Sequence, residues 1–366
     1  MSTYPLYDKP VPTETWNLPL AGNARFNWEY DDGRDRLLAL YQKGKDKQWD
    51  STRRIDWDLE VDPCDALGVP DESLAIYGTK YWDMLTPENR RELRKHQVAW
   101  QFSQFLHGEQ GAMITAARIV ESVPDVDSKF YSATQTMDEA RHVETFSRFL
   151  QEKVQLVYPI NPHLQALLAT TLSDSRWDMP YLGMQVLIEG LALAAFGLLR
   201  DTTTNPLPKQ ILSYVMQDEA RHVAFGRMAL KDAYADLTAA ERDEREEFVV
   251  EACYLMRDRL RGKEVWEMLG FPVEECLDYA DRSAFQQMFR SLLFTRIVPI
   301  VKDIGLWGEK VQKAYADMGV LDMAGVDLGA LMKADEDIAE NLDRERAAIE
   351  ARKAEVDLTI AQGASS

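Results

Sequence analysis

The chain has 366 residues, 46% of them hydrophobic, which is enough for one large domain or two ordinary ones. Its 61 acidic and 42 basic side chains give a net charge of −19, which argues against nucleic acid or an anionic membrane as a partner. The three cysteines (Cys64, Cys253 and Cys276) are far apart and form no C-x-x-C pair, which argues against a cysteine-based metal site. Together with an N-terminus that lacks the basic and apolar regions of a signal peptide, they favour a cytoplasmic location.

Residues 1–85 are predicted to form an irregular N-terminal arm. Six prolines interrupt its first 70 residues, which also contain the four tryptophans Trp16, Trp28, Trp49 and Trp57. One short helix is expected around Asp35–Lys43, stopped by Gly44. Because four tryptophans are a large apolar area to leave in water, we expect the arm to wrap around the rest of the molecule through them.

A long helix is predicted from residue 86 to about residue 123. It begins with T-P-E at residues 86–88, which supplies an N-cap, a proline at the first helical position and an acid in the first turn. Its apolar face includes Phe102 and Phe105, and Glu109 lies on that same face. The proline at 124 turns the chain, and a second helix is predicted to reach about residue 157 and to carry Glu139 and His142.

Two further long helices are predicted after a loop at residues 158–162 and a shorter helix. The first is the apolar run 182–199, which approaches the length of a membrane span but is interrupted by Gln185 and Glu189. A helix that is apolar all round and carries one glutamate is typical of the buried centre of a helical bundle. The second follows a break at residues 202–208 and carries Glu219 and His222 to about residue 236.

The remaining residues, 237–366, are predicted to form a helical extension that packs on the bundle of residues 86–236. The last stretch, about residues 327–356, is charged and has a thin apolar stripe at Ile338, Leu342, Ile349 and Val356. Such a stripe suits docking along another helix of the same chain or of a second one, as in a homodimer. No β-rich region is apparent, so the fold class is all-α.

One pentapeptide, D-E-A-R-H, occurs at residues 138–142 and again at residues 218–222. A glutamate stands 30 residues before the glutamate of each copy, namely Glu109 before Glu139 and Glu189 before Glu219. The two halves therefore form an internal repeat with an offset of 80 residues. Within each copy the glutamate and histidine are three residues apart, so both side chains lie on one helix face.

This pattern predicts a site for two metal ions in a four-helix bundle. The expected ligands are Glu109, Glu139, His142, Glu189, Glu219 and His222. Four carboxylates balance the charge of two divalent ions, and imidazole suits iron and similar metals. A single copy of the pentapeptide would more often be a surface acid–base pair, but two matched copies favour metal binding.

The aspartates that precede the paired glutamates are expected to support the histidines. Metal-bound histidine usually donates its second N–H to a carboxylate. The pseudo-twofold repeat lets Asp138 meet His222 and Asp218 meet His142. Arg141 and Arg221 are then expected to pair with these buried aspartates.

The paired D-E-A-R-H and the G-E-Q-G-A around Glu109 resemble the ferritin-like di-iron carboxylate superfamily over roughly residues 86–236. The similarity is to its oxygen-activating branch, which includes bacterial monooxygenase hydroxylase subunits, ribonucleotide reductase small subunits, acyl-carrier-protein desaturases and, more loosely, arylamine N-oxygenases. The resemblance implies a ferritin-like four-helix bundle, two iron ions or a manganese–iron pair per chain, O2 as a co-substrate, and Glu109, Glu139, Glu189 and Glu219 at the reacting centre.

The chain departs from these relatives in three respects. Phe146 stands where ribonucleotide reductase small subunits usually keep a radical tyrosine, and Val215 stands where arylamine N-oxygenases have a third histidine. Where monooxygenases and desaturases have a threonine, this chain has Ala192 and Leu193, so Gln185 becomes a candidate for proton delivery. Apolar side chains near the ligands are candidates to line a substrate pocket: Phe105, Phe146, Leu193 and Phe196, with Gln185 beside them. Of the other histidines, His107 is expected to have a structural or surface role, and His96 and His163 are expected to be exposed.

The function expected from these features is oxidation of a small, largely apolar organic substrate with O2, by hydroxylation, N-oxidation or desaturation. No G-x-G-x-x-G fingerprint for a flavin or nicotinamide is present, so the electrons are expected from a reductase or ferredoxin. The alternatives are a radical-generating small subunit or a ligand-binding oxidase with a Mn/Fe centre, and a ferroxidase. Ferroxidase chains of the ferritin type are usually about half as long as this one, which makes the last reading the weakest.

Overall fold

The computed structural model describes residues 16–30 and 33–363, except for the side chains of residue 350 and residues 353–363. The structure is 75% helical, and it contains no β-strand within the described ranges. The all-α prediction is confirmed. The core is formed by α4 (Pro87–Ser122), α5 (Val126–Arg148), α7 (Glu189–Thr202) and α8 (Pro206–Tyr234). Around it lie α1 (Asp35–Asp46), α2 (Ser51–Arg54), α3 (Lys80–Met84), α6 (Pro162–Ser173), α9 (Ala239–Asp258), α10 (Lys263–Met268), α11 (Val273–Arg282), α12 (Ala284–Leu292), α13 (Ile297–Asp303), α14 (Glu309–Asp317) and α15 (Leu328–Gly363).

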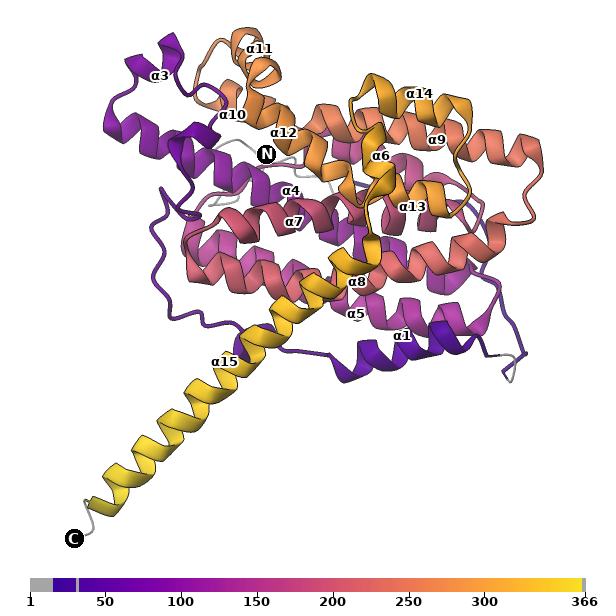
Figure 1. Cartoon of the computed structure of the whole chain (residues 1–366), viewed down its shortest axis with the longest axis horizontal. Helices are drawn as coiled ribbons and strands as arrows, with labels where there is room; N and C mark the ends of the chain where they lie inside the picture. Colours follow the sequence, from indigo (N-terminus) through magenta and orange to yellow (C-terminus); the bar gives the residue numbers. More distant parts are fainter. Residues whose placement is uncertain (1–15, 31–32, 364–366) are drawn as a thin grey trace.

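The four long helices form a bundle in which α4 packs on α5 and α7 packs on α8 (Figure 1). Side-chain caps set where its helices begin. Thr86 accepts a hydrogen bond from the backbone N–H of Asn89, and Asp125 accepts one from that of Ser128. Each cap satisfies a backbone donor that has no partner within the first turn. The helix start predicted at residue 86 is therefore correct, and the second helix begins directly after the turn predicted at Pro124.

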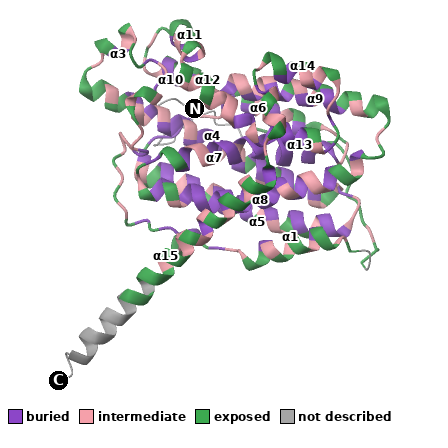
Figure 2. Cartoon of the chain, in the orientation of Figure 1, coloured by how far each residue is buried: buried purple, intermediate pink, exposed green. Residues whose placement is uncertain are grey.

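The most apolar helix of the chain lies at the centre of this bundle. It begins with a π-helical segment, η3 (Tyr181–Ile188), which continues directly into α7. The helix from Tyr181 to Thr202 is long and apolar enough to cross a membrane, but 89% of its most apolar window is buried inside the protein. In Figure 2, much of α7 and α8 is coloured as buried, and both helices lie in the middle of the bundle. The helix therefore lies in the core of the bundle, as predicted from its apolar sequence with a single glutamate.

Two glycines allow helices to approach each other closely. A Cβ atom on Gly111 would lie 2.5 Å from Cδ2 of Leu168, so α4 and α6 can meet only because position 111 has no side chain. Gly44 was expected to stop the first helix, which is wrong. The helix α1 continues through Gly44 to Asp46, because the glycine is buried where α1 packs on α5 and a Cβ there would lie 3.0 Å from Cγ2 of Thr134.

Only two of the four tryptophans expected to pack the N-terminal arm on the bundle are buried. Trp49 and Trp57 are buried, whereas Trp16 and Trp28 are 45% and 74% exposed. The expectation that all four wrap the bundle is therefore wrong for the first two. Prolines at positions 5, 10 and 12 lie outside the described residues.

His96 is buried rather than exposed as expected. It lies on α4, and its Nδ1 is 2.6 Å from the hydroxyl of Tyr158. The partner comes from the loop before α6, which the periodicity of α4 alone does not reveal. His107 has the structural role expected, since its Nε2 bonds the carbonyl of Tyr158 at 2.8 Å.

The C-terminal helix α15 first lies across α8 and then extends away from the body of the protein (Figure 1). Its first half is held by ion pairs with the arm, including Lys47 with Glu340 at 3.0 Å and Arg54 with Asp343. Along the predicted apolar stripe, Ile338 and Leu342 are half-buried and Ile349 is 56% exposed. Val356 lies outside the described side chains.

Candidate metal centre

Six side chains from the four long helices meet in the buried middle of the bundle. They fall into two overlapping groups, in each of which the donor atoms lie within 4.8 Å of one another. The first group is Glu109, Glu139, His142 and Glu219, and the second is Glu139, Glu189, Glu219 and His222. All six residues are at most 5% exposed. The structure thus brings together all the side chains that the repeat singled out.

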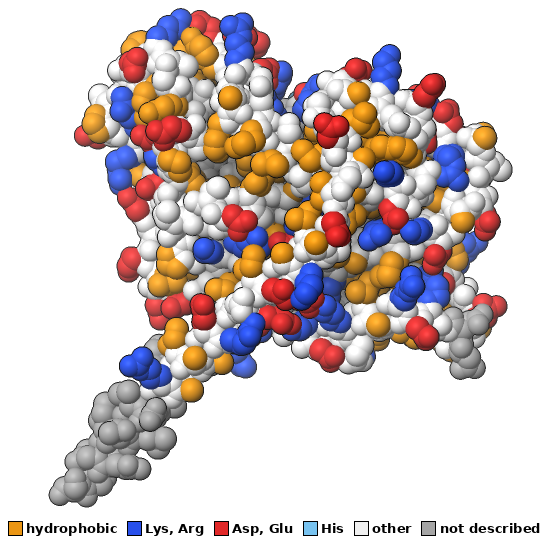
Figure 3. All heavy atoms as spheres, in the orientation of Figure 1, with side chains coloured by type: hydrophobic (Ala, Val, Ile, Leu, Met, Phe, Trp, Pro, Cys, Tyr) orange, Lys and Arg blue, Asp and Glu red, His pale blue; other side chains and the backbone are white. Residues whose placement is uncertain are grey.

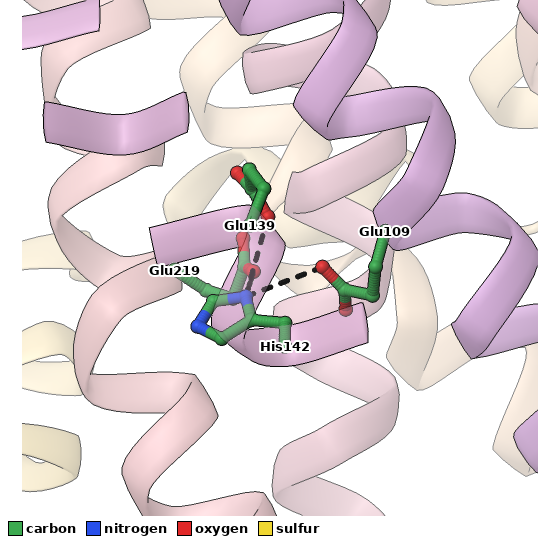
Figure 4. Close-up of side chains that lie close together, drawn as sticks. All are labelled: Glu109, Glu139, His142 and Glu219. Atoms are coloured by element: carbon green, nitrogen blue, oxygen red, sulfur yellow. Dashed lines mark hydrogen bonds and ion pairs between the residues drawn. The ribbon is translucent and has the colours of Figure 1, made fainter. Parts of the chain in front are cut away.

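In the first group the ring of His142 faces three carboxylates. Its Nδ1 lies 3.2 Å from Oε2 of Glu109 and 3.2 Å from Oε2 of Glu139. It also lies 3.1 Å from Oε1 of Glu219. Figure 4 shows these side chains pointing at one another from α4, α5 and α8. The helix α4 supplies the single glutamate, and its neighbour α5 supplies Glu-x-x-His. The i,i+3 spacing places Glu139 and His142 on one face of α5, and this face is turned toward Glu109.

The second group repeats this arrangement around His222. Its Nδ1 lies 3.0 Å from Oε1 of Glu139 and 3.5 Å from Oε2 of Glu219. Glu139 and Glu219 therefore belong to both groups, and each turns one oxygen toward either histidine. This is the placement that carboxylates need in order to bridge two ions.

A glutamine that the sequence did not single out joins this group. The side-chain amide of Gln135 donates to Oε1 of Glu139 at 3.1 Å and to Oε1 of Glu189 at 2.9 Å. Gln185 lies behind it and donates to Oε1 of Gln135 at 3.4 Å. Gln135 is one helical turn before Glu139, so the spacing could have revealed it, but a lone glutamine on an apolar face gives a weak signal.

Apart from the close approaches of histidine and glutamate given above, which are not hydrogen bonds for these atoms, several buried donor atoms of the cluster have no hydrogen-bond partner among the described residues. They are Oε2 of Glu189, both carboxylate oxygens of Glu219 and Nδ1 of His222. Buried polar atoms are nearly always satisfied in folded proteins, and unpaired buried carboxylates are costly. These atoms point into the cluster, and carboxylate oxygens with imidazole nitrogens are donors suited to iron or manganese. The residues present therefore fit a pair of metal ions.

Two aspartates hold the outer nitrogens of the histidines in a crossed arrangement. Nε2 of His142 lies 3.1 Å from Oδ2 of Asp218, and Nε2 of His222 lies 3.2 Å from Oδ2 of Asp138. Each pair joins α5 to α8, as the pseudo-twofold repeat predicted. An N–H donated from Nε2 leaves Nδ1 as the lone-pair nitrogen, and in both residues Nδ1 is the atom that faces the glutamates.

Arginines link the two aspartates to each other. Nη2 of Arg141 donates to Oδ1 of Asp138 at 2.5 Å and to Oδ2 of Asp218 at 2.8 Å. Arg221 bonds Oδ1 of Asp218 and lies 3.7 Å from Oδ2 of Asp138. Because both carboxylates are buried, each needs these cations to remain charged.

The N-terminal arm completes this network with two residues that the sequence did not assign to the site. The side-chain amide of Gln48 donates to Oδ1 of Asp138 at 2.7 Å, and its oxygen accepts from Nη1 of Arg141 at 2.7 Å. The indole N–H of Trp49 donates to Oδ2 of Asp218 at 2.8 Å. The arm therefore reaches the aspartates that hold the histidines.

The electrostatics of the cluster are those of a cation site. Burial, with the charge of Glu219, raises the pKa of Glu109 and of Glu189 well above that of an ordinary glutamate. Burial alone would lower the pKa of both histidines, but the surrounding carboxylates raise it well above the usual value. Protons thus compensate for buried negative charge that two metal ions would balance.

A small cavity of about 20 Å³ lies beside the cluster and touches three of its carboxylates. Phe105 and Phe196, predicted as pocket residues, line it, and so do Ala192 and Ile188. Phe146 packs in the aromatic cluster behind them, with its ring centroid 6.0 Å from that of Phe105 and 5.6 Å from that of Phe196. Gln185 and Leu193 are buried, but they do not line this cavity.

Comparisons with known proteins support this picture. The family model described as "P-aminobenzoate N-oxygenase AurF" matches residues 31–305. A search of curated proteins found no match.

Solved structures with a similar fold include R2-like ligand-binding oxidases. A mutant of such an oxidase with an anaerobically reconstituted Mn/Fe cofactor is 17% identical, with a TM-score of 0.51 over 77% of this chain and 96% of its own. An R2-like ligand-binding oxidase with an aerobically reconstituted metal cofactor after photoconversion is 16% identical, with a TM-score of 0.49 over the same shares. At this identity the likeness concerns the fold, which is ferritin-like, as the motif resemblance implied.

Proposed function

Because the chain belongs to the P-aminobenzoate N-oxygenase AurF family and is an oxidoreductase of the di-iron oxygenase and oxidase type, we propose that it uses O2 to oxidise a small, largely apolar organic molecule. The reaction is hydroxylation, N-oxidation or desaturation. The observation that carries the proposal is the meeting of four glutamates and two histidines in two overlapping groups at the buried centre of the bundle.

In this proposal the six side chains of the cluster are the metal ligands. Glu109 and His142 would hold one ion, Glu189 and His222 would hold the other, and Glu139 and Glu219 belong to both groups of donors. The ions are two irons or a manganese–iron pair, since the same donor types suit both metals. When bound, they supply the activation of O2, which protein side chains cannot provide.

The other residues of the site hold the ligands in place and keep water out. Asp138 and Asp218 fix the ring orientation of the histidines by accepting from Nε2. Gln135 fixes the carboxylates of Glu139 and Glu189 through its two N–H groups. The apolar walls of the adjacent cavity, including Phe105 and Phe196, exclude bulk water from the reacting atoms.

The ligand set differs from that of the arylamine N-oxygenases resembled in sequence. Val215, which is fully buried one turn before Glu219, cannot supply a third imidazole. One histidine would therefore be available for each of the two ions. For this reason the proposed reaction is not restricted to N-oxidation and includes hydroxylation and desaturation.

Several further features belong to the proposal. The electrons come from a separate reductase or ferredoxin. Residues 1–85 act as an arm, 86–236 as the di-metal bundle and 237–366 as a C-terminal extension, and the protein works in the cytoplasm. The exposed part of α15 is where a homodimer contact would form.

The proposal is tested by loading the metal-free protein with Fe(II) without oxygen, measuring the metal content, and then adding O2. We expect two ions per chain, uptake of O2 and a change in the visible spectrum that depends on the ligands. Growth of mineral cores instead would show an iron-storage function. A stable organic radical would support the radical-generating alternative.

A further inference from the structure

Three adjoining cavities lead from the surface of the protein toward the candidate metal centre. The outer one, of about 220 Å³, lies where α4, α7 and α12 meet. A middle cavity of about 10 Å³ shares four wall residues with it: Trp100, Gln101, Leu260 and Phe289. The middle cavity in turn shares Phe105 with the inner one, which lies beside Glu109. The middle cavity has room for about one water molecule, so it is the narrowest part of this route.

Three of the four residues at this narrow point belong to helices of the protein body. Trp100 and the residue after it lie on α4, and Trp100 is only 6% exposed. Its indole N–H donates to Oε2 of Glu264 at 2.9 Å, which holds the ring in place. Leu260 lies in η4 (Arg259–Arg261), which continues α9 directly. Phe289 is the fourth residue, and it comes from the surface helix α12.

The helix α12 lies over the outer cavity without being buried itself. None of its nine residues is buried, although four apolar ones line the outer cavity: Phe285, Met288, Phe289 and Leu292. Of these, Met288 is 54% exposed. Figure 3 shows hydrophobic side chains gathered on this face where α12 lies over the bundle. A helix without a buried side chain gains less from burial than the core helices do, so it opens locally at a lower cost.

One side-chain hydrogen bond, among the described residues, connects α12 to the arm on the other side of the outer cavity. Nε2 of Gln286 donates to the backbone carbonyl of Ser73 at 2.8 Å, and Ser73 belongs to η1 (Asp71–Ser73). Gln287 and Arg290 interact with the end of α11 instead, which precedes α12 in the chain. Loss of the bond from Gln286 therefore frees α12 from the arm while α12 stays attached to α11.

We propose that α12 is a lid over this route and that Phe289 determines, by the size of its ring, which organic molecules pass from the outer cavity toward the metal centre. The lid opens when Gln286 releases the carbonyl of Ser73, and the ring of Phe289 then leaves the middle cavity. The inference rests on the proposed function, because it names the residue that selects the substrate of the same site. Phe289 does not line the inner cavity, so it selects a molecule before that molecule reaches the glutamates.

Labelling of a thiol placed behind Phe289 tests this selection in the metal-free protein. Ala195 lines the middle cavity and is 2% exposed, so Ala195→Cys introduces a thiol inside the route. The half-buried Cys64 is changed to serine in the same chain so that it does not react, while Cys253 and Cys276 are buried. Iodoacetamide and iodoacetanilide carry the same reactive group and differ by one phenyl ring. Mass spectrometry gives the labelling rate for each reagent, relative to its rate with free cysteine.

Substitution of Phe289 in this background is expected to change the size selection. Phe289→Ala should raise the rate with iodoacetanilide about tenfold or more, and that with iodoacetamide by less, because labelling of a buried thiol follows the fraction of molecules that are open to the reagent. Phe289→Leu, which keeps an apolar contact, should give intermediate rates. The matched control is Phe285→Ala, which removes the same ring from the same helix but from the outer cavity alone. Equal rates in Phe289→Ala and the control, or no labelling in either, would overturn the proposal.

Hydrogen exchange tests the movement of the lid itself. Gln286→Ala is expected to speed exchange of the backbone amides of α12 and labelling with both reagents, while α4 and α7 stay as protected as in the parent. Unchanged exchange in α12, or faster exchange throughout the bundle, would contradict a lid held by Gln286.

These measurements need no metal, which keeps the two proposals distinct. If the centre binds no iron but Phe289 controls labelling, only the oxygenase function fails. If the iron-loaded protein takes up O2 but labelling does not depend on Phe289, only the lid fails.

Discussion

Trp49 donates its indole N–H to Oδ2 of Asp218 at 2.8 Å, the same oxygen that lies 3.1 Å from Nε2 of His142. The two residues are 169 positions apart in the chain. The arm therefore helps to fix the position of an aspartate on which the orientation of a candidate ligand depends. Arg141 stacks on the same indole, with its guanidinium carbon 4.7 Å from the ring centroid. The arm is thus a structural part of the metal centre.

Trp49→Phe is expected to keep the fold and to weaken metal binding by up to about tenfold, because the Asp218 carboxylate loses one donor and the His142 ring becomes less well held. Metal retained after dialysis against a graded series of chelator concentrations measures the effect. The control is Trp57→Phe, since Trp57 is also buried in the arm but donates to the backbone carbonyl of Ser51 instead. Equal metal retention by both variants would show that the contact with Asp218 has no role at the centre.

Removal of a cluster side chain should abolish binding of at least one metal ion. Glu139→Ala deletes a carboxylate that faces both histidines, and His222→Ala deletes the imidazole of the second group. Metal content per folded chain is the measurement, and circular dichroism checks that the helices remain. Glu144→Ala, an exposed change on the same helix as Glu139, is expected to retain both ions. Two ions per chain in either test variant would refute the ligand assignment.

Asp218→Asn should leave the fold intact and lower metal affinity or activity by ~10–100-fold, because the amide can no longer accept from His142, Arg141 and Trp49 with a full charge. The same change at Asp138 is expected to act on His222 and to have a similar effect. Comparison of the two variants with the parent in a competition titration for Mn²⁺ measures the shift. Parent-like affinity in both would remove the supporting role of the aspartates.

The sequence was sufficient to predict which side chains meet at the centre, because the spacing of residues within the repeat determines which of them share a helix face. Three-residue spacing places Glu139 and His142 on one helix face, and the equivalent pair on α8 follows from the same rule. The crossed contacts of the aspartates then follow from the approximate twofold relation of the two halves. Both predictions use only the spacing within helices and the relation between the two halves, so they do not depend on the conformation of the loops or of the terminal regions.

Residues that reach the site from outside the bundle could not be predicted in this way. Gln48 and Trp49 come from the arm. Arg259, which lines the small cavity beside the cluster, follows α9, which packs on η3 and α6 rather than joining the four long helices. Their positions depend on long-range packing, and no motif marks them. The error at Gly44 has the same origin: a glycine usually ends a helix, but here the close approach of α5 requires one within it.

Metal binding should strengthen as the pH rises. The pKa values of Glu109 and Glu189 are raised first by burial and then by the charge of Glu219, and those of His142 and His222 are raised by the carboxylates that oppose the effect of burial. At a given pH these groups hold more protons in the metal-free protein than free side chains would. Ligands must lose their protons to bind a metal, so the metal-bound state holds fewer protons and a higher pH favours it.

Each proton released changes the metal affinity about tenfold per pH unit within the range where that group titrates. Calorimetric titration of Mn²⁺ in buffers of different ionisation enthalpy gives the number of protons released, and its repetition above and below neutral pH gives the slope. In the variant His222→Ala, any ion that still binds should release fewer protons, because one of the raised groups is gone. Absence of proton release, or an affinity that does not change with pH, would mean that protons do not occupy the donor atoms before the metal does.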